Sequence, residues 1–115
     1  MDWIKLTDEN QLEECWNLSH QKPQLIFKHS TRCSISTMAL SRFEGSGILE
    51  SDAVDSYYLD LIQFRNISNA IESKSGVIHQ SPQVIVLNKG EVFLSETHGM
   101  INGRSILQEI KTLNS

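Results

Sequence analysis

The sequence is 115 residues long with a mass of 13.1 kDa, which suits one compact domain and leaves too little chain for two domains of ordinary size. Its 39% hydrophobic and 21% charged residues, with six glycines and two prolines, exclude collagen-like, low-complexity and strongly disordered proteins. A formal net charge of -4 argues against binding to nucleic acid or to an anionic membrane surface. We therefore expect a single domain over residues 1–115.

The first half of the chain predicts alternating strands and helices. Residues 3–6 suit a short strand, and Thr7 or Asp8 can then cap a helix whose apolar positions repeat at helical spacing: Leu12, Cys15 and Trp16. Pro23 ends that segment, and residues 24–28 suit a buried parallel strand. After a turn at residues 29–32, a helix is expected from Cys33 to about Glu44, where Gly45 and Gly47 stop it.

The second half continues this order and then changes it. Residues 54–61 predict a strand, and a short helix with Ile67 and Ile71 on one face ends at Gly76. Strands at residues 84–87 and 92–94 flank a turn at residues 88–90, which predicts an antiparallel hairpin. A last helix carries apolar residues at helical spacing: Ile106, Leu107, Ile110 and Leu113. The expected α/β fold is β-α-β-α-β-α-β-β-α, with a mixed central sheet flanked by helices.

The beginning of the chain gives an expectation for location. Acidic residues stand where a signal peptide needs a basic start, and no apolar run approaches the roughly 18 residues of a membrane span. We therefore expect a cytoplasmic protein that does not associate with a membrane.

Cys33 is the candidate reactive residue. A cysteine in the first turn of a helix lies near free backbone N–H groups and the positive end of the helix dipole, which stabilise the thiolate. Arg32 adds a neighbouring positive charge, and Ser36, one helical turn later, can direct its hydroxyl towards the sulfur. Ser36 stands where a C-x-x-C motif has its second cysteine, so the resolving thiol must come from elsewhere, most simply from a small thiol in solution. Cys15 is expected to pack in the core as a small hydrophobic residue.

Pro82 is the second anchor of the candidate site. It immediately precedes the fourth strand, which in this element order begins beside the helix that carries the thiol. A cis Ser81–Pro82 bond at this point would present backbone donor and acceptor groups to an extended substrate.

These residues resemble a known family. The element order, the C-x-x-S motif at a helix start and the proline before the hairpin look like the thioredoxin fold. The segments 28–36 and 79–83 resemble the YtxJ-like monothiol bacilliredoxins, whose motif reads Thr-Cys-Pro-Ile-Ser. Cys33, Ile35 and Ser36 match that motif. Arg32 stands in place of the motif threonine, although Thr31 comes one residue earlier, and Ser34 replaces the motif proline. Losing that proline restores an N–H at the helix start. We therefore expect the pKa of the Cys33 thiol and its redox potential to differ from those of the family, while the attacking sulfur is kept.

The resemblance implies a thiol-disulfide oxidoreductase that removes bacillithiol from mixed disulfides with client proteins. Cys33 would be the attacking group and bacillithiol the thiol co-substrate, with no tightly bound cofactor and no metal. Arg32 and Ser36 would stabilise the thiolate. Four further residues would bind substrate: Thr31, Ser34, Ser81 and Pro82.

Two other functions remain open from the sequence. One is an iron-sulfur carrier similar to monothiol glutaredoxins, although Cys-Ser-Ile-Ser departs from the Cys-Gly-Phe-Ser of those proteins. The other is an adaptor that keeps the thioredoxin fold without catalysis, because a fold does not establish an activity.

Overall fold

The structure is a computed structural model that describes residues 3–31 and 34–113. Its helices and strands follow the predicted order: β1 (Ile4–Lys5), α1 (Glu9–Leu18), β2 (Gln24–His29), α2 (Ser34–Glu44), β3 (Asp55–Asp60), α3 (Arg65–Ser75), β4 (Gln83–Asn88), β5 (Glu91–Thr97) and α4 (Gly103–Thr112). Two short 3-10 turns that the sequence did not predict, η1 (Ile48–Glu50) and η2 (His98–Met100), follow α2 and β5.

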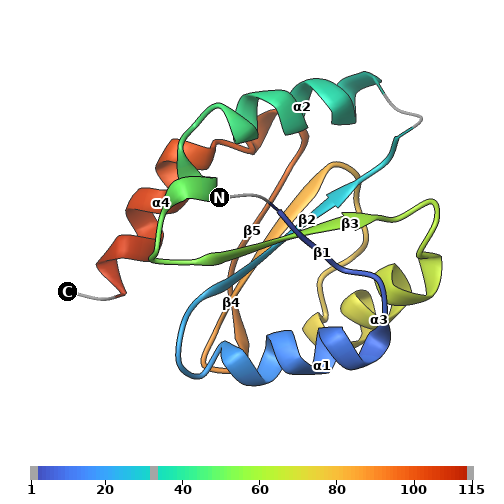
Figure 1. Cartoon of the computed structure of the whole chain (residues 1–115). Coiled ribbons are helices and arrows are strands. Elements are labelled where there is room, and N and C mark those ends of the chain that lie inside the picture. The colour runs from blue at the N-terminus through green and yellow to red at the C-terminus, as the bar shows by residue number, and fades with distance from the viewer. Residues whose placement is uncertain (1–2, 32–33, 114–115) are drawn as a thin grey trace.

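The five strands form one mixed sheet in the order β1-β3-β2-β4-β5 (Figure 1). β3 lies parallel to both β1 and β2, whereas β4 is antiparallel to both β2 and β5. The β4–β5 hairpin turns through Lys89 and Gly90, whose φ angles of 55° and 79° are the positive values that a tight two-residue hairpin requires. The mixed sheet is therefore confirmed.

Helices cover both faces of the sheet, with α2 and α4 on one side and α1 and α3 on the other (Figure 1). Each face has its own apolar cluster, one around Phe27 and Phe43, the other around Ile26 and Ile71. All six residues of β2 are buried, as expected for a central strand that is covered on both faces. No helix in the described part of the chain is long and apolar enough to cross a membrane.

Local signals in the sequence explain where two helices begin and one ends. The Asp8 carboxylate accepts a hydrogen bond from the Gln11 N–H at 2.8 Å and caps α1, and Asn102 caps α4 in the same way through the Ser105 N–H. Gly76 ends α3 with a φ of 72°. β2 differs slightly from the prediction, because His29 still pairs with Asp60 and belongs to the strand rather than to the turn.

The pairing of β2 with β4 brings two distant segments together. Lys28, near the end of β2, lies opposite Gln83, the first residue of β4. Because the two strands are antiparallel, the residues that follow β2 and those that precede β4 lie at the same edge of the sheet. The residues that directly follow β2 and the Ser81–Pro82 segment are therefore neighbours.

Candidate active site

The segment between β2 and α2 contains the predicted reactive residue. Arg32 and Cys33 lie outside the described residues, and Cys33 directly precedes Ser34, the first residue of α2. Thr31 and Ser34, on either side of that pair, are both exposed. The two residues proposed to bind substrate in this segment are therefore open to solvent.

Ser36 is completely buried beneath the start of α2. Its Oγ accepts a hydrogen bond from the Ser30 N–H at 3.2 Å and lies 2.9 Å from Nδ1 of His29. Burial lowers the pKa of His29, and the carboxylates of Asp60 and Glu44 partly oppose this effect. In the neutral tautomer with an unprotonated Nδ1, His29 accepts a hydrogen bond from the Ser36 hydroxyl, so Ser36 ties the start of α2 to the end of β2.

The Ser81–Pro82 peptide bond is cis, as the sequence predicted. Pro82 is buried, and its carbonyl oxygen accepts a hydrogen bond from the N–H of His98 at 3.1 Å. This bond joins η2 to the residues that precede β4. Ser81 Oγ is buried and has no hydrogen-bond partner among the residues that the structure describes.

A polar cluster that the sequence did not predict holds His79, which lies in the segment that leads into Pro82. Lys28 is completely buried, and its Nζ lies 3.3 Å from Nδ1 of His79, which is also 3.2 Å from Ser68 Oγ. The backbone N–H of His79 donates to Glu72 Oε2 at 2.8 Å. Burial lowers the pKa of Lys28 to about 8, and the charge of Glu72 partly opposes this effect. A lysine within the apolar run of a buried strand was the signal in the sequence for this cluster.

Cys15 lies on the opposite side of the sheet from α2, in the cluster with Ile26 and Ile71, and is completely buried. Burial raises its pKa to about 12, so its thiol stays protonated at neutral pH. Cys15 is therefore unsuited to act as a nucleophile or as a resolving thiol without a rearrangement of the core.

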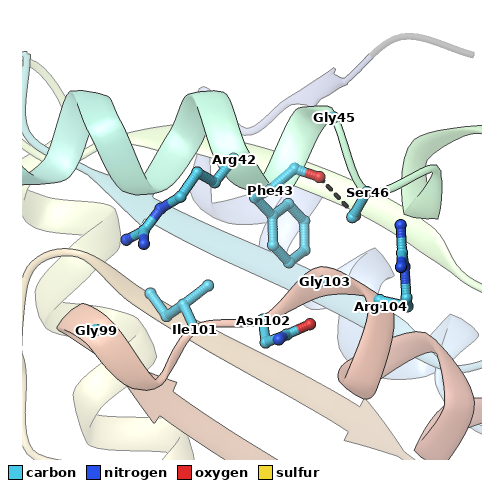
Figure 2. Close-up of a pocket in the computed structure, with 9 residues that line it drawn as sticks. All are labelled: Arg42, Phe43, Gly45, Ser46, Gly99, Ile101, Asn102, Gly103 and Arg104. Atoms are coloured by element: carbon cyan, nitrogen blue, oxygen red, sulfur yellow. Dashed lines mark hydrogen bonds between the residues drawn. The ribbon is translucent and has the colours of Figure 1, made fainter.

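A cavity of about 330 Å³ lies between the end of α2 and the start of α4 (Figure 2). Its polar lining residues are Arg42, Ser46, Asn102 and Arg104, and Phe43 and Ile101 contribute apolar surface. None of the described residues that line it is acidic. Among the residues described, no group of three or more His, Cys, Asp and Glu could hold a metal ion.

The structure thus places those predicted residues that it describes in two groups at one edge of the sheet. Thr31, Ser34 and Ser36 belong to the turn and the start of α2, whereas Ser81 and Pro82 precede the paired strand β4. Such an arrangement can hold an extended disulfide substrate between a helix start and a strand start.

Comparisons with known proteins agree with this architecture. Residues 4–106 match the family model described as Monothiol bacilliredoxin BrxC. A solved structure described, provisionally, as an oxidoreductase with a thioredoxin fold has 36% sequence identity and a TM-score of 0.77, covering 91% of this chain and 90% of its own. Two thioredoxins share the fold at lower identity. The Malassezia sympodialis protein has 15% identity and a TM-score of 0.72, and an N21Q mutant from Halobacterium salinarum has 11% and 0.75; each match covers 99% of this chain and 92% of the other.

Proposed function

Because the chain belongs to the monothiol bacilliredoxin family and has the thioredoxin fold, we propose that it removes bacillithiol from mixed disulfides with client proteins, with Cys33 as the attacking group. The observation that carries the proposal is the family match over residues 4–106, which includes the Cys33 motif and the Pro82 segment. The pairing of β2 with β4 supports it, because Lys28, which precedes the motif, lies opposite Gln83, which directly follows Pro82.

The reaction is a pair of thiol-disulfide exchanges. The Cys33 thiolate attacks the bacillithiol sulfur of the mixed disulfide, a new disulfide forms between Cys33 and bacillithiol, and the client leaves as a thiolate that takes up a proton. A second bacillithiol thiolate then attacks the bacillithiol sulfur bound to Cys33. This step releases the Cys33 thiolate and leaves oxidised bacillithiol for a separate reductase, so one free bacillithiol thiol is oxidised to a disulfide for each client thiol that is formed.

The surrounding residues have proposed roles in these steps. Arg32 contributes a positive charge next to the sulfur, and the Ser36 hydroxyl supports the start of α2, where backbone N–H groups favour the thiolate. Thr31 and Ser34 would contact the substrate from one side. Ser81 and Pro82 would contact it from the other.

The test is the release of bacillithiol from a client protein that carries one bacillithiolated cysteine. Intact-mass analysis should show one bacillithiol adduct on the wild-type protein during the reaction. Cys33→Ser should abolish both the adduct and client release, whereas the matched variant Cys15→Ala should keep both. Equal client release by Cys33→Ser and the wild type would refute the proposal and favour an adaptor role.

A further inference from the structure

The cavity between α2 and α4 is positively charged in a protein whose net charge is -4. Arg42 and Arg104 both line it, and neither forms a salt bridge with any residue that the structure describes. The salt bridges among the described residues are formed by lysines that do not line the cavity. Two guanidinium groups without carboxylate partners, beside a hollow with no acidic lining residue, favour an anionic ligand.

The cavity is connected to the candidate active site through η2. Gly99 lines the cavity, and the adjacent residue, His98, donates its backbone N–H to the carbonyl oxygen of Pro82. Arg42 belongs to α2, the helix that begins directly after Cys33. Figure 2 shows its guanidinium extending away from Gly45, back towards the N-terminal end of α2, as helical side chains do. The end of the cavity lined by Arg42 and Gly99 therefore lies towards the N-terminal end of α2.

We propose that this cavity binds the carboxylates of the small thiol that exchanges with Cys33, with Arg42 as the main contact and Arg104 as the second. The inference rests on the proposed function and adds to it the part of the protein that selects the thiol. Bacillithiol suits such a site because it carries two carboxylates on a malate group at the end of the molecule opposite its sulfur. A guanidinium group can hold a carboxylate through two parallel hydrogen bonds, and about 330 Å³ is within the usual size of a small-molecule site.

The charge of the disulfide substrate provides the first test. The rate of Cys33 adduct formation is measured with bacillithiol disulfide, which has carboxylates, with coenzyme A disulfide, which has phosphates, and with cystamine, which has no anionic group. Arg42→Gln and Arg104→Gln should each lower kcat/KM for bacillithiol disulfide by about three- to tenfold through a higher KM. The same variants should leave the reaction with cystamine unchanged.

Two control variants separate a specific contact from a general effect of charge. Lys111→Gln removes one positive charge from the last turn of α4, about two turns from Arg104, and should leave all three rates unchanged. Arg42→Lys keeps the charge and should recover part of the rate lost in Arg42→Gln. The proposal is overturned if the arginine variants react like the wild type, or if they slow cystamine as much as bacillithiol disulfide. A loss confined to coenzyme A disulfide would also overturn it, because the site would then select phosphates.

A binding experiment separates this inference from the proposed function. Malate is titrated into the Cys33→Ser protein, and the amide resonances of Gly99 and Gly103 are followed by NMR. Saturable shifts that Arg42→Gln weakens at least threefold support the carboxylate site, and unmoved resonances overturn it. If the wild type forms no adduct with bacillithiol disulfide, the proposed function fails, whereas the carboxylate site is still decided by this titration.

Discussion

Replacing Lys28 with methionine should remove a buried positive charge at little cost in packing. The lysine side chain is completely buried near the end of β2, and its Nζ lies 3.3 Å from Nδ1 of His79. Methionine has a similar length and volume. In the variant, Nδ1 of His79 keeps a hydrogen-bond partner, because Ser68 Oγ lies 3.2 Å from it and can donate a hydrogen bond.

The expected effect follows from the pKa of Lys28, which burial lowers from 10.5 to about 8. Between these two values the unfolded chain binds the proton and the folded protein does not, so stability rises with pH. With one pKa unit equal to 1.36 kcal/mol, the wild type should gain about 1.3 kcal/mol between pH 7 and pH 9 from this residue. Below pH 8 the buried charge costs about 3 kcal/mol relative to an unperturbed lysine, and Lys28→Met should recover part of it.

Urea unfolding at pH 7 and pH 9 provides the measurement, with Lys111→Met as an exposed control. The difference in stability between Lys28→Met and the wild type should shrink by about 1.3 kcal/mol from pH 7 to pH 9. Comparing the two proteins cancels the contribution of Cys15. Its raised pKa stabilises both proteins fully below pH 9, and that stabilisation is lost as the pH rises towards 12. A difference that does not change with pH would refute the argument that Lys28 titrates near pH 8.

Three further substitutions test local packing and hydrogen bonding by urea unfolding. Gly103→Ala should cost about 1–3 kcal/mol, because the new Cβ would overlap Ser46 Oγ and lie 2.8 Å from Ser46 Cβ; unchanged stability would contradict this close contact. Cys15→Ala should cost about 1–2 kcal/mol through the cavity it leaves, and iodoacetamide labelling at neutral pH should proceed at the wild-type rate. A slower rate would show that this thiol reacts. Ser36→Ala should cost about 1–3 kcal/mol, because it leaves a buried backbone N–H and His29 Nδ1 without their partner; a loss below 0.5 kcal/mol would refute this.

The sequence predicted most of the fold because its local signals agree with one another. The apolar run at residues 24–28 indicated a strand covered on both faces, and β2 is buried throughout. Residues 88–90 indicated a tight hairpin, and Lys89 and Gly90 adopt the required positive φ angles. The end of β2 was wrong by one residue. His29 looked like part of a polar turn, but its pairing with β3 keeps it in the sheet, because strand pairing outweighs local propensity.

The candidate site was predictable to a smaller extent. A cysteine motif and a proline can be recognised from residue types and spacing, so Ser36 and Pro82 could be named in advance. The sequence did not reveal that Ser36 hydrogen-bonds to His29, or that His79 contacts Lys28 across 51 positions of sequence. Such contacts depend on which strands are neighbours and on which face each side chain lies, and local patterns do not contain this information.

The sequence by itself determined the order of the elements, the thiol at a helix start and the lack of a second cysteine beside it, because these depend on residue type and on short-range spacing. The tertiary structure decided which charges lie together. The order β1-β3-β2-β4-β5 places Lys28 against His79, and the packing of α4 on α2 creates a cavity with Arg42 and Arg104 on its lining. The burial of a charge and the shape of a cavity both depend on segments that are far apart in the chain, and these meet only when the sheet and its two helical layers have assembled.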